Sequence, residues 1–151
     1  MSRLVPHTTA PSWPAIPAGC FAATIRCDSP RGCTVALLGL PDDTGVRLNH
    51  GRPGARNGPR AFRAALASSD AGAARTGVRP GVFDAGDIRP GRTLEETHRR
   101  VTAATAALLS AGLFPIAIGG GHDLTFPFVR AIAAAHPKLA ALYFDPHLDV
   151  R

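Results

Sequence analysis

Short apolar runs alternate with longer stretches of helical periodicity along most of this chain. The runs at residues 34–40, 82–84, 114–118 and 139–144 have the length and composition of strands in a buried parallel sheet. The segments between them carry the apolar spacing and the capping residues of helices. The order β-α-β-α-β-α-β predicts an α/β fold, a three-layer sandwich with a mostly parallel sheet.

The first expected helix follows a glycine-rich loop. Asn57 is a good N-cap, and Pro59 is tolerated in the first turn because its missing N–H would be unpaired there anyway. Phe62, Ala65 and Leu66 recur at the spacing of one helical face. We therefore expect these three side chains to face the core.

The second and third helices are predicted from their ends. Thr93 and Glu96 form a capping box, in which the threonine caps the helix and the glutamate reaches back. This helix is expected to end near Ala111, where Gly112 can take the left-handed conformation that terminates helices. The third helix is expected over residues 124–136.

The chain before Thr34 has a different character. It is rich in Pro, Ala, Thr and Ser and shows no periodicity, so we expect residues 1–33 to form a loose arm in which Trp13 and Phe21 need a place to pack. Residues 34–151 would then form the folded unit.

Composition excludes several classes of protein. The 151 residues carry a net charge of +6, almost wholly from scattered arginines, and include one Trp and one Tyr. This pattern does not favour nucleic-acid binding. Prolines interrupt any signal peptide, and no run approaches the roughly 20 apolar residues of a membrane span. The cysteines Cys20, Cys27 and Cys33 are odd in number and are expected to be free thiols of a cytoplasmic protein.

Metal-ligand residue types follow two of the predicted strands. Gly119-Gly120-Gly121-His122-Asp123 comes after the run at 114–118, and Asp145-Pro146-His147-Leu148-Asp149 comes after the run at 139–144. Because parallel strands have their carboxyl ends at one edge of the sheet, His122 can converge with the second motif. Alternation along an extended chain would point Asp145, His147 and Asp149 the same way. Two carboxylates and two imidazoles suit a divalent first-row metal, and the alternative is an acidic strand end with solvated histidines.

These two motifs resemble the first two metal motifs of the ureohydrolases, the family that contains arginase, agmatinase and formimidoylglutamase. Residues 51–63 resemble the glycine-rich segment and following helix of that family, and residues 83–87 match its Asp-x-Gly-Asp turn, which implies a structural role for Asp84 and Asp87. The resemblance covers residues 34 to 151. It implies an arginase-like fold and a hydrolase that cleaves C–N bonds in small linear amidines.

The resemblance also implies roles for single residues. Two manganese ions would activate the attacking hydroxide; His122 and Asp149 would hold one ion, His147 the other, and Asp145 would bridge both. Asp149 would also pass a proton to the leaving amine. Asp123 would orient a ligand, and its place after the histidine favours formimidoylglutamase-like members over agmatinase-like ones.

Two departures from the family pattern bear on activity. Pro146 stands where the family usually has Ala, and the third family motif, Asp-x-Asp, is not found in these residues. An intact family member would then have two more metal-binding carboxylates than this chain. The four ligands expected here could hold one ion, and a second ion only weakly. We therefore expect an amino-terminal portion of an arginase-like domain, apparently truncated and lacking the carboxyl-terminal half.

Two other functions remain open from the sequence. The chain could be a non-enzymatic truncated or split product, which would associate with itself or with a complementary carboxyl-terminal chain. It could also be a nucleotide-binding α/β domain, since glycines follow a strand and open a helix. In that motif, however, Leu124 stands where a third glycine is needed for close packing. The residues that bind substrate are not identified by the sequence.

Overall fold

The computed structural model describes residues 4–69 and 80–145, which form a four-stranded sheet in the order β1-β3-β2-β4. The strands are β1 (Thr8–Thr9), β2 (Val35–Gly39), β3 (Val82–Ile88) and β4 (Phe114–Ile118). Strand β2 pairs in parallel with both β3 and β4, whereas β1 pairs antiparallel with β3. The mostly parallel sheet predicted from the sequence is confirmed.

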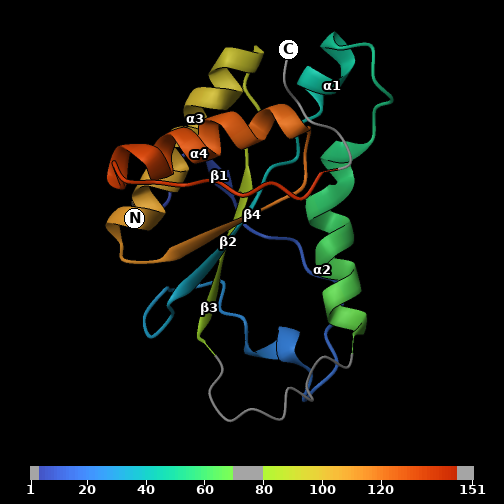
Figure 1. Ribbon diagram of the computed structural model, residues 1–151. Coiled ribbons are helices and arrows are strands. Elements are labelled where there is room, and N and C mark those ends of the chain that lie inside the picture. Colours follow the sequence, from blue (N-terminus) through green and yellow to red (C-terminus); the bar gives the residue numbers. More distant parts are fainter. Residues whose placement is uncertain (1–3, 70–79, 146–151) are drawn as a thin grey trace.

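Helices cover both faces of this sheet. The α-helices are α1 (Thr44–Leu48), α2 (Gly58–Ser68), α3 (Leu94–Ser110) and α4 (Thr125–Ala135), and single 3₁₀ turns are η1 (Phe21–Thr24), η2 (Ala55–Asn57) and η4 (His122–Leu124). Figure 1 shows α2 on one side of the sheet and α3 with α4 on the other. This is the predicted α/β sandwich. Among the described residues, no helix combines the length and the apolar character needed to cross a membrane.

The main core lies between the sheet and α3. Val101, Ala104 and Leu108, at helical spacing, are fully buried against Ala36 and Leu38 of β2. The predicted cap of α3 is present, since the backbone N–H of Glu96 donates to the Thr93 hydroxyl at 3.2 Å. This helix is therefore fixed both by its first turn and by its apolar face.

Helix α2 is present where it was predicted, but its buried face agrees with the prediction only in part. Pro59, Arg63 and Ala67 are buried, Phe62 and Leu66 of the expected stripe are partly buried, and Ala65 is exposed. The apolar pattern was misleading because Arg63 finds charged partners inside the protein. Its Nε and Nη2 donate to the two oxygens of Asp84 at 2.7 and 2.9 Å, and its Nη1 donates to Asp87 at 2.7 Å.

Asp84 and Asp87 thus join α2 to the sheet, in agreement with the structural role expected of them. Asp84 is fully buried and also accepts hydrogen bonds from the Gly86 backbone N–H and the Trp13 indole, both at 2.9 Å. A carboxylate with this many donors is satisfied without water. Burial lowers the pKa of Arg63, but the two aspartates outweigh it and hold that pKa above its usual value.

Strand β3 is longer than predicted. We expected Gly86 and Asp87 to turn the chain, but the strand continues to Ile88. Gly86 has a φ of 90°, and a Cβ placed on it would lie 1.8 Å from the Thr9 carbonyl oxygen. The pairing of β3 with β2 shifts register at this point, so the glycine bends the strand without ending it.

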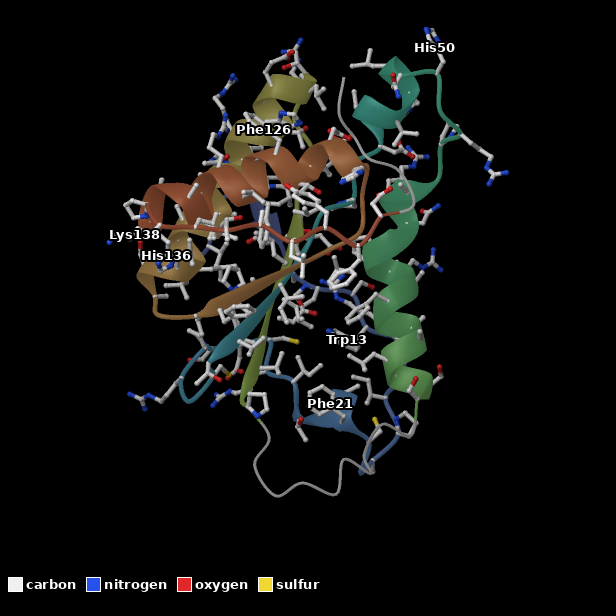
Figure 2. The ribbon with its side chains drawn as sticks, viewed as in Figure 1. Trp13, Phe21, His50, Phe126, His136 and Lys138 are labelled. Carbon is white, nitrogen blue, oxygen red and sulfur yellow. The ribbon has the colours of Figure 1, made fainter. Side chains whose placement is uncertain are left out.

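Part of the amino-terminal arm packs against the folded unit. Strand β1 lies along β3, and Val5 belongs to the core cluster. Figure 2 shows Trp13 in the space between the sheet and α2, where its indole reaches Asp84. The turn η1, which contains Phe21, contacts α2. Trp13 and Phe21, the aromatic residues of the arm, are therefore packed against the folded unit, as the sequence predicted.

The prediction of a fourth strand at residues 139–144 is wrong. This segment is extended but pairs with no strand among the described residues, and the exposed fraction of Phe144 is 94%. A strand that is apolar on both faces needs cover on both sides. Of the described elements only α4 and β4 lie beside it, and neither supplies a hydrogen-bonded ladder. As a result β4 pairs on one side alone, with Phe114 67% exposed.

We predict that Arg63→Met lowers the free energy of unfolding by about 3–5 kcal/mol, because it leaves buried carboxylates without their cation. Urea denaturation followed by circular dichroism measures the loss. Arg60→Met, an exposed position of the same helix, is the control and should change stability little. Equal unfolding midpoints for the two variants would contradict the assignment.

We also predict that residues 1–151 associate in solution, because the open edge of β4 and the apolar segment beside it favour pairing with another chain. Leu142→Glu should lower the mean mass measured by light scattering. Leu48→Glu is the matched control, since Leu48 is also an exposed leucine but lies on α1. A monodisperse monomer for the unaltered chain would overturn this expectation.

Candidate metal centre

The site is built on a loop of three glycines after β4. Gly119 and Gly120 have φ angles of 72° and 86°, in the left-handed region that glycine enters without strain. A Cβ on Gly120 would lie 2.2 Å from the Leu40 carbonyl oxygen, and one on Gly119 would lie 2.7 Å from Pro59. Both the conformation and the close packing therefore require glycine.

Backbone hydrogen bonds attach this loop to two others. The Gly120 N–H donates to the carbonyl of Ala55 at 3.2 Å, and the Gly121 N–H donates to the carbonyl of Asp42 at 2.8 Å. The glycine loop is thus fixed between the turn before α2 and the turn after β2. The backbone of His122, the next residue, is therefore held in a defined position.

Asp42 in turn is held by its own side chain. One carboxylate oxygen accepts from the Thr44 backbone N–H at 2.6 Å, and the other accepts from the Thr97 hydroxyl at 2.8 Å. Burial raises the pKa of Asp42, but the hydrogen bonds from Thr44 and Thr97 outweigh it, so this pKa lies below its usual value. No local pattern predicts the contact of Asp42 with α3, because Thr97 lies 55 positions further along the chain.

Asp43 fixes the next stretch of chain in the same way. Its buried carboxylate accepts from the Gly54 backbone N–H at 2.8 Å and from the guanidinium of Arg47. The Gly54 N–H, followed by Arg47, holds the pKa of Asp43 below its usual value. Two adjacent aspartates after β2 therefore organise the loops around the glycines.

His122 and Asp145 come together as the sequence predicts. His122 Nδ1 lies 3.8 Å from Asp145 Oδ2, although 23 positions separate the two residues in the chain. Metal ions bind such ligands at about 2.0–2.2 Å, so two ligands of one ion lie within roughly 4 Å of each other. The pair fits a divalent ion both in its donor atoms and in its spacing.

The other two predicted ligands, His147 and Asp149, lie outside the described residues, as does Pro146. Within residues 4–69 and 80–145, no group of three His, Cys, Asp or Glu side chains is placed to hold a metal. The structure therefore brings together two of the four predicted ligands. The complete set remains a prediction.

Asp123, expected to orient a ligand, contacts α3. Its Oδ2 lies 3.1 Å from Nε2 of His98. A carboxylate only accepts, so Nε2 of His98 carries the proton of this hydrogen bond. No sequence pattern connects His98 with the glycine loop, because the two lie on different elements 25 positions apart.

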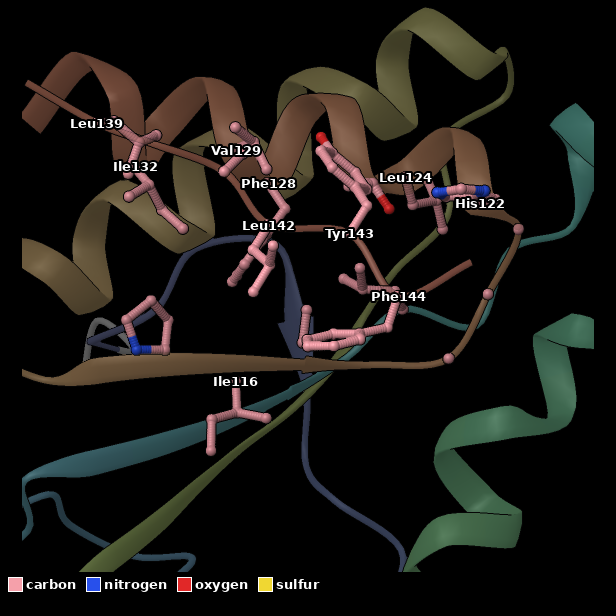
Figure 3. A pocket seen from close by; sticks show the side chains of 18 of the residues that line it. Ile116, His122, Leu124, Phe128, Val129, Ile132, Leu139, Leu142, Tyr143 and Phe144 are labelled. Carbon is pink, nitrogen blue, oxygen red and sulfur yellow. The ribbon is translucent and has the colours of Figure 1, made fainter. Parts of the chain in front are cut away.

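An apolar groove of about 770 Å³ runs up to His122 between β4, α4 and residues 139–144. Figure 3 shows Leu142, Tyr143 and Phe144 in this groove, with His122 near one end. Among the described residues its lining is almost entirely aliphatic and aromatic, with no carboxylate for a cationic amidine. The groove therefore has the chemistry of uncovered core more than that of a substrate pocket.

The family to which these features belong is decided by comparison with known proteins. The model of the arginase family matches residues 33–151. This chain belongs to the arginase family. The resemblance stated from the metal motifs and the predicted fold class are thereby confirmed.

Comparison with individual members of the arginase family shows how much of their length this chain covers. Formimidoylglutamase from Ralstonia nicotianae is 38% identical over 133 residues, which cover 82% of this chain and 39% of that protein. Human mitochondrial guanidino acid hydrolase is 35% identical over 126 residues, covering 80% of this chain and 35% of that protein. A Trypanosoma cruzi formiminoglutamase solved with Mn²⁺ superposes with a TM-score of 0.65 at 34% identity, over 73% of this chain and 38% of that chain. The chain spans about two fifths of the length of these relatives.

We predict that this member of the arginase family binds Mn²⁺ through Asp145. Asp145→Ala should weaken binding at least about 10-fold, because it removes a charged ligand beside His122. Titration calorimetry measures the affinity. Asp28→Ala removes an exposed carboxylate that pairs with Arg26 and is the matched control. Equal affinities for the Asp145 variant and the unaltered chain would sink the ligand assignment.

Proposed function

We propose that this chain is the amino-terminal portion of a metal-dependent hydrolase that cleaves C–N bonds in linear amidines. Membership of the arginase family supports the reaction class. The observation that carries the proposal is the approach of His122 to Asp145, an imidazole nitrogen and a carboxylate oxygen, at the carboxyl end of β4.

The metal is proposed to be Mn²⁺, with two ions in an intact enzyme. A relative of known structure was solved with Mn²⁺, and the mixed nitrogen and oxygen donors suit that class of ion. His122, Asp145, His147 and Asp149 would hold the metal. When bound, it would supply a water of lowered pKa as nucleophile near neutral pH.

The protein's own groups would move the protons. We assign to Asp149 the acceptance of a proton from the attacking water and its delivery to the leaving amine. His122 needs no proton transfer in this scheme, because it acts as a neutral donor. Its position is set by the glycine loop.

The substrate is a small amidine with either a formimidoyl or a guanidino group. The relatives include a formimidoylglutamase and a guanidino acid hydrolase, so membership of the family does not distinguish a formimidoyl from a guanidino substrate. Asp123 directly after the histidine favours the formimidoylglutamase-like choice. We therefore place formimidoylglutamate first among substrates and agmatine second.

A cytoplasmic location and a unit beginning at about residue 34 are also proposed. The cysteines Cys20, Cys27 and Cys33 are all free, as in a reducing compartment. The exposed groove and the open side of β4 support association with a second copy or with a complementary chain.

Nucleotide binding is disfavoured by the same glycine loop. A dinucleotide fold offers free backbone N–H groups to the pyrophosphate. Here the N–H groups of Gly120 and Gly121 are already bonded to Ala55 and Asp42. Leu124, where the third glycine would be needed, is buried.

A chimera tests the proposed function. Residues 34–151 would replace the matching part of the Ralstonia nicotianae formimidoylglutamase, and formamide release from formimidoylglutamate with Mn²⁺ would be measured. We predict turnover by the chimera, none by its Asp145→Ala variant, and none by residues 1–151 alone, since the set of ligands and substrate contacts is incomplete.

Two outcomes would contradict the proposal. One is a folded chimera that binds Mn²⁺ and releases no product from formimidoylglutamate, agmatine or arginine. The other is equal turnover by the chimera and its Asp145→Ala variant. The first outcome would favour a non-enzymatic role for this chain, and the second would remove Asp145 from the metal ligands.

A further inference from the structure

We propose that His98 is a positioning residue, which holds the Asp123 carboxylate in a slot between two glycines and thereby fixes the loop that carries His122. The inference rests on the proposed function in so far as His122 binds metal. The slot itself and its closure by His98 stand on geometry alone.

The slot is defined by Gly45 of α1 and Gly121 of the glycine loop. A Cβ on Gly45 would lie 2.3 Å from Cγ of Asp123, and a Cβ on Gly121 would lie 2.3 Å from Oδ1 of the same residue. Real Cβ atoms do not approach other atoms this closely. The carboxylate therefore occupies space that any larger residue at either position would fill.

Conformational freedom does not explain these two glycines. Gly121 has a φ of −65°, which every residue adopts, and Gly45 lies inside a helix, where alanine is more favourable than glycine. Their shared property is contact with Asp123. The close approach of one carboxylate accounts for both.

His98 closes the slot from α3. Its Nε2 lies 3.1 Å from Oδ2 of Asp123, and its side chain is largely buried. The imidazole also packs against the ring of Phe126, with centroids 6.1 Å apart. The ring is therefore held between the loop and α4.

Helix α4 is tied to α3 beside this contact. The guanidinium of Arg130 lies 5.2 Å from the centroid of Phe126 and donates to the Thr102 hydroxyl at 2.7 Å. The same hydroxyl donates to the carbonyl of Pro127 at 2.9 Å. His98 thus projects from a fixed surface, and it can transmit that rigidity to Asp123 and to the adjacent Gly121 and His122.

Hydrogen exchange tests this without any metal. The Gly121 N–H, bonded to Asp42, reports the closed loop, and the Ala104 N–H in the core of α3 reports global opening. Exchange would be measured by mass spectrometry with residue-level fragmentation. In His98→Ala we expect Gly121 to exchange at least about 10-fold faster while Ala104 is unchanged.

Three further variants make the result specific. His98→Gln can donate from a similar position and should restore most of the protection. Arg99→Ala, an exposed neighbour on α3, should leave Gly121 unchanged. Gly45→Ala should speed exchange at Gly121 although it favours helix α1, because the new methyl group displaces the carboxylate.

Mn²⁺ binding provides the second readout, followed by the paramagnetic resonance of the free ion. His98→Ala should weaken binding about 10-fold and His98→Gln much less. If the unaltered chain binds no Mn²⁺, the proposed function fails, while the exchange data still judge the role of His98. Unchanged protection of Gly121 in His98→Ala overturns the inference. If His98→Ala does not fold, the exchange of Gly121 in Gly45→Ala is the test. Unchanged exchange of Gly121 in that variant would also overturn the inference.

Discussion

The rest of the site depends on close backbone contact between the glycine loop and the start of α2. A Cβ on Gly58 would lie 2.8 Å from the Cα of Gly119, and one on Gly119 would lie 2.9 Å from the Cα of Gly58. Two glycines facing each other let the loop after β4 reach the loops that precede α1 and α2. Any side chain here would push the loop away, and with it His122. The position of His122, the proposed metal ligand, is therefore set by the absence of side chains at neighbouring positions.

The side of the sheet covered by α2 depends on a buried charge. Arg63 carries its cation into the interior because three hydrogen bonds from its guanidinium reach Asp84 and Asp87. An arginine suits this place better than a lysine, since its planar group matches a carboxylate at two points. The network fixes α2 to β3, and α2 begins at the glycine contact. A charge cluster on one face of the sheet thus supports the loop at its edge.

The sequence predicted most elements because local signals agree there. The apolar run ending at Ile118, the Thr93 cap and the glycine motif each act within a few residues. The buried position expected for Ala65 of α2 and the strand expected at residues 139–144 were wrong because long-range partners decide them. The aspartates that bind Arg63 in the interior lie 21 and 24 positions away, beyond the reach of a local pattern. The contact of His98 with Asp123 was missed for the same reason. His122 and Asp145 come together although the strand expected before Asp145 does not form, because residues 139–144 still lie beside β4.

The apolar groove adjoins the proposed metal centre, so packing in the groove affects the solvent around the metal ligands. His122 lines the groove, and its side chain is about half exposed to solvent. In water, the attraction between a cation and Asp145 is strongly screened, whereas in a water-poor site the same charges interact several times more strongly. Any segment that covers Leu142 and Phe144 would also remove solvent from His122. Burial of this apolar segment and stronger binding at the proposed metal centre would therefore be coupled, because one packing event would accomplish both.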